Sequence, residues 1–497
     1  MTPSSASTSR LHGNPRAWGQ RLIGGALLVA TGVLLGEQYL TPNKRVIPSI
    51  LALIVFGMAW RFSMMSGIGV LVMALPFPRG TTFGNTNLAL ILMLAVIWLL
   101  RISQRESALP RRTPLDAPMA ALLLCYVLSF YNVSEMTNLK YGLANFELFV
   151  GCLLTFVLIV NSVRTRRDLE LLHLFQIASA VSLFVLAVYE LNHPGAMFIR
   201  GWLDFTQTTG TEFNTKNVRV GSSFRDYELL SEFCVITLGL VVFRMVRARS
   251  FGARAAYIGV MLLNVFVLFT TVTRGAIIAG GIGMVLLLWM IRRRLRVVPF
   301  TIVTGGATAG LLALEWYVSH YTRSGDIFTR LMATQVVNGW MPDSRADVWP
   351  NAWARALVHP LLGQGPYYGV MKGYALFWPH CVYLYYANIL GFTGLAVFLW
   401  LLWRLWKATR PTVDQMTDPD YAEAFKLVAR TQLVVFAVNE VKIDYLRNPI
   451  YQFVVWVMFA SWVAAELVTR HEALPAPAAE LVRAPARGPI QPAVGRA

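Results

Sequence analysis

Long apolar runs, most of them of roughly 18 residues or more, recur along this chain and constrain its fold more than any other feature. A run of that length is what an α-helix needs to cross the hydrocarbon layer of a membrane. The composition agrees, because 56% of the residues are hydrophobic and only 14% are charged. Soluble domains usually carry charge on about a quarter of their residues. The sequence therefore predicts an all-α, polytopic integral membrane protein with about 12–14 transmembrane helices.

The predicted transmembrane domain covers residues 22–470, after a cytoplasmic segment at 1–21 and before a Pro- and Ala-rich, disordered tail at 471–497. We expect the first run to be a retained helix rather than a signal peptide. The runs 46–60 and 65–77 are short and fit either two short spans or one re-entrant element. The predicted spans are 22–40, 46–60, 65–77, 85–102, 116–132, 143–163, 169–191, 227–246, 255–272, 276–291, 298–317, 382–403, 427–441 and 449–468.

The formal net charge of +18 comes largely from arginines in short clusters between the apolar runs. This pattern is typical of cytoplasmic loops beside anionic lipid, and it excludes a nucleic-acid-binding interpretation because no aromatic and basic stripe accompanies it. With a cytoplasmic N-terminus, the clusters after 102, 163, 246, 291 and 403 all fall on the cytoplasmic side. The long loops 192–226 and 317–380 then share the outer face, and the C-terminus is cytoplasmic.

Arg274 is the most informative charged residue on that outer face. It lies in the tight turn Thr271-Val272-Thr273-Arg274-Gly275-Ala276, between two apolar runs. A charge at membrane depth costs about 2.5–3.5 kcal/mol at a helix centre and usually faces a cavity that binds an anion, although an arginine in a turn can also reach lipid head groups.

Other outer residues have a structural and a functional interpretation. Arg219 and Arg225 lie in a polar loop, where Asp226 and Glu228 are obvious ion-pair partners. His380 follows Pro379 where the large loop re-enters the membrane, whereas His359 precedes Pro360 and is expected at a structural bend.

Two arginines and a histidine at one membrane face suit transfer from a lipid-linked diphosphate. Guanidinium groups bind phosphate oxygens bidentately, and histidine is the side chain best suited to take a proton near neutral pH. The outer loops have no acidic cluster with the spacing of a divalent-metal site, so we expect neither a metal nor another cofactor. The four cysteines show no metal-ligand spacing and no disulfide framework.

Several short motifs in the second half of the chain resemble those of the O-antigen ligase and polymerase superfamily. They are the turn at Arg274, Arg345 with Trp349 and Trp353, the segment His359-Pro360-Leu361-Leu362-Gly363-Gln364-Gly365-Pro366, His380 with Tyr383-Leu384, and Gly391-Phe392-Thr393-Gly394. The resemblance implies a GT-C-type fold and a glycan donor on undecaprenyl diphosphate. It also implies inversion at the sugar carbon without a metal or a nucleotide sugar.

The resemblance also assigns roles to residues of this chain. Arg219 and Arg274 match the family's pyrophosphate-binding arginines, His380 matches its proposed base, and Arg345 matches the arginine that opens the large-loop motif. Arg225 and Arg323, in the two outer loops, join Arg345 as candidate substrate-binding residues. Two features depart from the family pattern, namely Cys381 after the histidine and Arg225-Asp226-Tyr227 after Arg219.

The sequence therefore predicts a glycosyltransferase of the bacterial inner membrane that joins a lipid-linked polysaccharide to a glycolipid or glycan acceptor. A repeat-unit polymerase or a protein glycosyltransferase would share the chemistry and differ in the acceptor. The alternative from another class is a transporter or flippase for lipid-linked sugars, which would favour a repeated half, and the chain shows no internal repeat. In either case membrane lipids are partners. We expect the loop 317–380 to act as a lid and to form the acceptor-facing wall.

Overall fold

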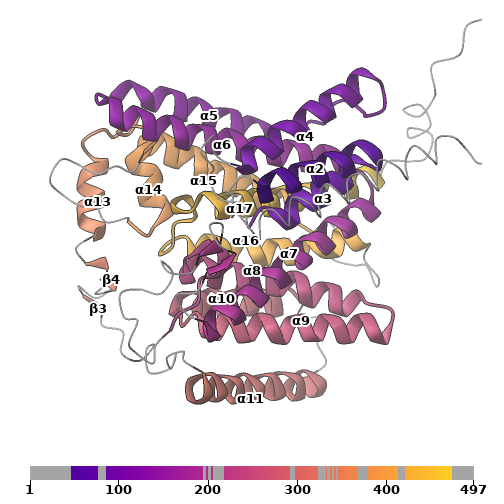
Figure 1. The fold of residues 1–497 in the computed structure, drawn as a ribbon. Coiled ribbons are helices and arrows are strands. Elements are labelled where there is room, and N and C mark those ends of the chain that lie inside the picture. Colours follow the sequence, from indigo (N-terminus) through magenta and orange to yellow (C-terminus); the bar gives the residue numbers. More distant parts are fainter. Residues whose placement is uncertain are drawn as a thin grey trace, which may run out of the picture.

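The computed structural model describes residues 46–76, 86–193, 197–199, 203–204, 218–291, 297–322, 332, 336–337, 341–342, 345–346, 348–367, 379–411 and 420–472. In these residues the helices pack side by side in a bundle, with α11 at its edge beside α9 (Figure 1). The helices are α2 (Val46–Arg61), α3 (Met64–Ala74), α4 (Thr86–Ser103), α5 (Asp116–Ser129), α6 (Met136–Ser162), α7 (Arg166–Asn192), α8 (Tyr227–Arg247), α9 (Phe251–Thr270), α10 (Arg274–Ile291), α11 (Val297–Tyr321), α13 (Val348–Ala356), α14 (Val382–Ile389), α15 (Gly391–Ala408), α16 (Tyr421–Asn439) and α17 (Pro449–Glu472).

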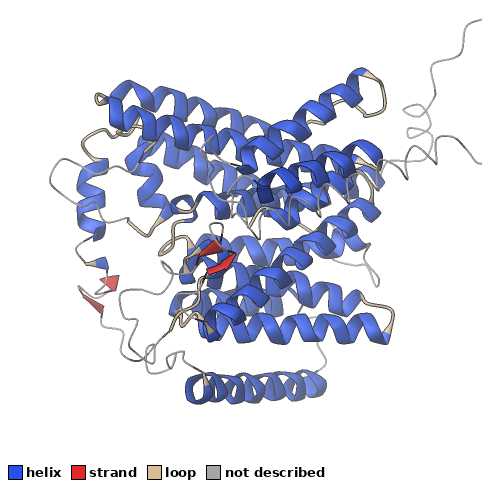
Figure 2. Ribbon diagram, viewed as in Figure 1, coloured by secondary structure: helices blue, strands red, loops and turns tan. Residues whose placement is uncertain are grey.

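The remaining regular structure is short. Among the described residues, Figure 2 shows short antiparallel strand pairs in red, and one-turn 3-10 helices connect longer elements. These are β1 (Met197–Ile199) with β2 (Leu203–Asp204), β3 (Val336–Val337) with β4 (Met341–Pro342), and η1 (Phe130–Asn132), η2 (Ser222–Phe224) and η5 (Tyr445–Arg447).

The helices confirm an all-α polytopic membrane protein. Within the described ranges, five helices are long and apolar enough to cross a membrane, namely α6, α7, α8, α9 and α17. The shorter apolar helices include α2, α3, α4 and α10. Most predicted spans begin and end within a few residues of an observed helix. For example, the predicted span 227–246 corresponds to α8. The predicted span 22–40, the segment 1–21 and nearly all of the tail 471–497 lie outside the described residues.

The ambiguous region 46–77 forms a hairpin of two helices, α2 and α3. The Ser63 side chain caps α3 by accepting a hydrogen bond from the Ser66 amide. Gly67 lets the two helices approach closely, because a Cβ there would lie 2.5 Å from the Ala59 Cβ. With 11 residues, α3 is about 16 Å long, so the hairpin is made of two short helices.

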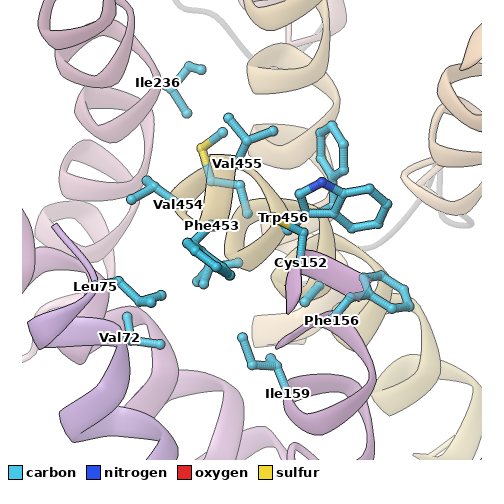
Figure 3. Close-up of a cluster of buried hydrophobic side chains, with 14 of the residues drawn as sticks. Val72, Leu75, Cys152, Phe156, Ile159, Ile236, Phe453, Val454, Val455 and Trp456 are labelled. Carbon is cyan, nitrogen blue, oxygen red and sulfur yellow. The ribbon is translucent and has the colours of Figure 1, made fainter. Parts of the chain in front are cut away.

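Helix α17 lies at the centre of the bundle and packs against α6 (Figure 3). The Trp456 ring meets Phe149 and Phe156 of α6 edge to face, with centroids 5.9 and 6.1 Å apart. Small residues allow the helices to come close, since a Cβ at Gly151 would lie 2.9 Å from Leu88 of α4. In lipid, where apolar burial alone does not drive helices together, such close packing stabilises the bundle.

The predicted span 382–403 is broken, which the apolar pattern did not indicate. Helix α14 ends at Ile389 and α15 begins at Gly391, whose φ of +71° favours glycine. A Cβ at this glycine would lie 2.3 Å from the Leu361 carbonyl oxygen. A segment upstream in the sequence contacts the chain at this break, because the Phe392 amide donates a hydrogen bond to the Pro360 carbonyl at 2.7 Å. The break therefore exposes backbone groups that the His359–Pro366 segment satisfies.

The same segment also holds α13 in place. Gly363 has a φ of +70°, and a Cβ there would lie 2.3 Å from the Ile389 carbonyl carbon. The Asn388 side chain donates to the Ala352 carbonyl at 2.9 Å, and Arg355 donates to the Gln364 side-chain oxygen at 2.6 Å. The glycine-rich motif is thus the connector that fixes α13 and the end of α14 to each other.

The two ends of the bundle can be distinguished by their contacts. At one end, which we call the site end, α8, α10, α14 and α17 begin while α7, α9 and α16 end (Figure 1, left). At the opposite end, α7 and α16 begin and α8 ends, joined by the Arg166–Asp420 ion pair at 2.9 Å and by the Arg247 bond to the Asp420 carbonyl at 3.3 Å. The arginine clusters after 163 and 246 lie at this opposite end, and His380 lies at the site end, in the grouping that the sequence predicted.

Candidate active site at the site end

The N-terminus of α8 presents two carboxylates at the site end. Asp226 is the N-cap of α8, and its Oδ1 accepts hydrogen bonds from the Glu228 and Leu229 amides at 2.9 and 3.1 Å. Glu228 lies in the first helical turn, where a negative charge is favoured by the helix dipole. Upstream, the buried Glu190 of α7 accepts from the Gly221 and Ser222 amides at 3.0 and 2.7 Å. The segment before α8 is therefore fastened to α7.

Arg447, in η5 between α16 and α17, joins these carboxylates to the histidine. Its guanidinium donates to Asp226 at 2.6 Å and to Glu228 at 2.8 Å, and its Nη1 lies 2.5 Å from His380 Nδ1. The side chain is only 9% exposed. Burial alone would lower the pKa of Arg447, but the attraction of Asp226 and Glu228 outweighs it and raises the pKa above its ordinary value. Arg447 is thus a permanent cation that holds α8, η5 and the histidine together.

His380 is held from several sides. Its backbone has a φ of +45°, in the left-handed region. The preceding Pro379 carbonyl accepts a hydrogen bond from the Trp349 indole of α13 at 2.9 Å, and the Val382 amide at the start of α14 donates to the Glu440 carbonyl at 2.9 Å. The ring Nδ1 also lies 3.5 Å from Glu228 Oε2. His380 Nδ1 therefore faces both a donor, Arg447, and an acceptor, Glu228.

Arg219 fastens the turn that carries Arg274. Its guanidinium donates to the Thr271 carbonyl at 2.9 Å, to the Val272 carbonyl at 3.3 Å and to the Thr273 hydroxyl at 3.1 Å. Its Cζ lies 3.2 Å from the centroid of the Tyr227 ring. A cation at the C-terminal carbonyls of α9 is favourable. Through these contacts Arg219 positions the residues that lead directly into α10, whose first residue is Arg274.

Two more predicted residues, Arg345 and Arg225, lie near this network. Arg345 is 3.5 Å from Glu228 Oε1, so the large loop contacts the α8 carboxylate. Arg225 ends η2 with a φ of +54°, and burial lowers its pKa. Arg323 falls outside the described residues.

The ion-pair partners of Asp226 and Glu228 are not the ones that the sequence suggested. The sequence suggested Arg219 and Arg225 as their partners, but the ion pairs of these carboxylates are with Arg447 and Arg345, and Glu228 also lies near His380. Sequence reasoning missed Arg447 altogether. The signal that could have found it is the connection 440–448, a short outer turn that carries Lys442, Asp444 and Arg447 between two apolar runs.

Backbone strain gathers at the site end. Among the described residues, five that are not glycine have a positive φ, and four of them lie in this region: Ser222, Arg225, Val272 and His380. A β-branched residue such as Val272 is seldom found there. Such conformations cost about 1–3 kcal/mol each and persist where the surrounding structure enforces them, which is frequent at functional sites.

Among the acidic residues of the site end, Asp226 and Glu228 form ion pairs with arginines. Within the ranges described above, no group of three or more His, Cys, Asp or Glu side chains could hold a metal ion.

Comparison with known proteins places part of this site in a family. A family model described as O-Antigen ligase matches residues 259–399. The matched region holds Arg274, Arg345, His380 and the broken helix, whereas Arg219 and Arg447 lie outside it. No curated protein matches the chain. The match confirms the resemblance found in the sequence: residues 259–399 of this polytopic membrane protein are similar to the O-antigen ligase family.

Proposed function

We propose that this protein is a membrane glycosyltransferase of the O-antigen ligase type, in which His380 is the base. The donor is a glycan on undecaprenyl diphosphate, and the acceptor is a hydroxyl group of a glycolipid or glycan. One observation carries this proposal: His380 is held between Arg447 and Glu228, at the end of the bundle that also carries Arg274, Arg219 and Arg345. The match to the O-antigen ligase family covers the histidine and two of these arginines.

The chemistry that suits these residues is a direct displacement. The acceptor oxygen forms a bond to the anomeric carbon from the side opposite the diphosphate, so the configuration inverts. The bond between that carbon and the diphosphate oxygen breaks, and undecaprenyl diphosphate leaves with the electron pair. The proton of the acceptor hydroxyl passes to His380. Arg274, with Arg219 and Arg345, stabilises the charge that develops on the diphosphate.

The position of His380 between a donor and an acceptor sets its tautomer. A guanidinium only donates hydrogen bonds, so when Arg447 bonds to Nδ1, a neutral ring carries its proton on Nε2 and cannot accept another there. When Nδ1 instead donates to Glu228, Nε2 has a lone pair and can accept the acceptor's proton. Glu228 is therefore proposed as the positioning residue of the base, and it also stabilises the imidazolium formed in the step.

The charges at the two ends support a membrane orientation. Basic clusters are retained on the cytoplasmic side, and the clusters after 163 and 246 lie at the opposite end. We accordingly place the site end at the periplasmic face of a bacterial inner membrane and both chain termini in the cytoplasm. The segment 317–380, of which α13 is fixed beside α14, is assigned to the acceptor side of a GT-C-like arrangement.

The decisive experiment is transfer by the purified protein. A synthetic glycan on undecaprenyl diphosphate is supplied with a lipid A–core acceptor, and the new glycosidic bond is measured by mass spectrometry. His380→Ala is expected to lower the rate by about 10²–10⁴-fold, the usual contribution of a general base. His359→Ala is the matched control, since the bond recorded for His359 uses its backbone carbonyl and survives the substitution.

The outcomes separate the alternatives. A bond formed to a second lipid-linked glycan, but never to lipid A–core, would assign the protein as a repeat-unit polymerase. A purified protein that moves the lipid across a vesicle membrane and makes no bond would be a transporter. Full activity of His380→Ala at normal protein level would contradict the enzyme mechanism.

A further inference from the structure

Lys442 lies against the turn that carries Arg274, although it belongs to a distant part of the sequence. It is in the connection between α16 and α17, five residues before Arg447. A Cβ built on Gly275 would lie 1.8 Å from both Cε and Nζ of Lys442. The ammonium group therefore occupies the space that any side chain at position 275 would fill. Because Gly275 follows Arg274 directly, the lysine ammonium and the backbone of Arg274 are neighbours.

Two arginines and one carboxylate act electrostatically on Lys442. Burial is the main cause that lowers the pKa of Lys442 to about 8. The attraction of Glu228 opposes this shift, and the weaker repulsion of Arg274 and Arg345 adds to it. Within the part of the chain that the structure describes, no carboxylate forms an ion pair with this ammonium. Cations held together at a partly buried position repel one another, and a bound anion removes that cost.

We propose that Lys442 is a further donor-binding residue, whose ammonium contacts the diphosphate together with Arg274, and that Gly275 provides the space for it. This inference rests on the proposed function. A lysine supplies a compact point charge with three rotatable donors, which complements the planar grip of an arginine on a phosphate group. Glycine is then needed at position 275 because a side chain there would displace the Lys442 ammonium from the donor. The formation of α10 does not itself require glycine.

Gly275 offers a test that leaves every charge in place. It lies in the first turn of α10 and has no positive φ, so alanine is compatible with its backbone. Alanine is also the better helix former. The Lys442 side chain is flexible at its far end, so Gly275→Ala should fold normally and move only the ammonium. Gly281→Ala is the matched control, because a Cβ at this glycine of the same helix meets nothing within 4 Å.

The experiment measures binding of undecaprenyl diphosphate to the purified full-length protein in lipid nanodiscs, and the KM for the glycan-bearing donor. Lys442→Gln should weaken binding and raise KM by about 10-fold or more, the effect of losing one hydrogen bond to a charged group. Gly275→Ala should weaken binding about fivefold or more by displacing the ammonium. Gly281→Ala and Lys140→Gln, an exposed lysine of α6, should behave as wild type.

The results distinguish this inference from the proposed function. If wild type binds the lipid diphosphate and both Lys442→Gln and Gly275→Ala bind it equally well, Lys442 is not a donor ligand and the proposed function stands. If Lys442→Gln is poorly folded, Gly275→Ala decides alone. A wild-type protein that fails to bind undecaprenyl diphosphate would overturn both proposals.

Discussion

The two ends of the bundle both bury charged side chains, but they use them differently. At the opposite end, Lys426 of α16 is 2% exposed and lies 3.0 Å from Glu423 and 2.5 Å from Glu466 of α17. Glu466 also pairs with Arg470 at 2.6 Å. Nearby, the buried His173 bonds to the Tyr421 hydroxyl at 2.8 Å. These contacts join α16 to α17 and to α7.

At the site end, cations and carboxylates gather where several segments meet. Arg447 forms ion pairs with Asp226 and Glu228, Arg345 lies 3.5 Å from Glu228, and Lys442 interacts electrostatically with Glu228, Arg274 and Arg345. Four positive-φ residues accompany them. Buried charge alone therefore does not mark a functional site in a membrane protein. Buried charge held by a strained backbone is the more specific signal.

The largest effect is expected from Arg447→Met at the site end. It leaves Asp226 and Glu228 buried without their main partner, and removing one member of a buried ion pair costs about 3–5 kcal/mol. It also frees His380 from its anchor, so transfer per folded molecule should fall at least about 100-fold. Thermal unfolding and transfer assays on the purified protein measure the two losses. Transfer at the wild-type rate would show that the network does not serve the reaction.

Lys426→Met tests whether the charged cluster at the opposite end stabilises the fold without serving transfer. It removes the cation between Glu423 and Glu466, so a stability loss of about 3–5 kcal/mol is again expected. Because this cluster lies at the opposite end, transfer per folded molecule should stay within about twofold of wild type. A transfer loss comparable to that of Arg447→Met would mean that the two ends are functionally coupled.

A smaller effect is the pH dependence of donor binding. The pKa of Lys442 is lowered to about 8, so its ammonium is protonated below that pH and loses its charge as pH rises. Affinity for undecaprenyl diphosphate should therefore fall between pH 7 and 9, by up to about 10-fold. The charged groups that act on Lys442 are Glu228 of α8, Arg274 of α10 and Arg345. The fall should be absent in Lys442→Gln, and its persistence there would assign it to another group.

Much of the fold could be predicted from the sequence because spans depend on local length and hydropathy. The break at Gly391 could not, since the run stays apolar through it and the break is stabilised by the distant carbonyls of Pro360 and Leu361. Among the proposed site residues, Arg274 and His380 were predicted from their unusual surroundings in the sequence. Arg447 and Lys442 were not predicted, because their proposed roles depend on the place where the α16–α17 connection meets α8 and α10.

The arrangement also refines what Arg219 does. Sequence reasoning placed it among the phosphate-binding groups, and its observed bonds go to the turn before Arg274. Its contribution to donor binding is therefore proposed to include holding Arg274 in place. This role arises from contact between two segments that are about 50 residues apart in the sequence, so no local sequence pattern indicates it.

The most direct measurement is a cryo-electron microscopy structure of the protein with a non-hydrolysable lipid-linked diphosphate donor. Our account predicts that the diphosphate lies at the site end, within hydrogen-bonding distance of Arg274 and Lys442, and that the sugar carbon to be attacked faces His380 Nε2. A diphosphate bound at the opposite end, or one at the site end with His380 too distant for proton transfer from an acceptor, would contradict it.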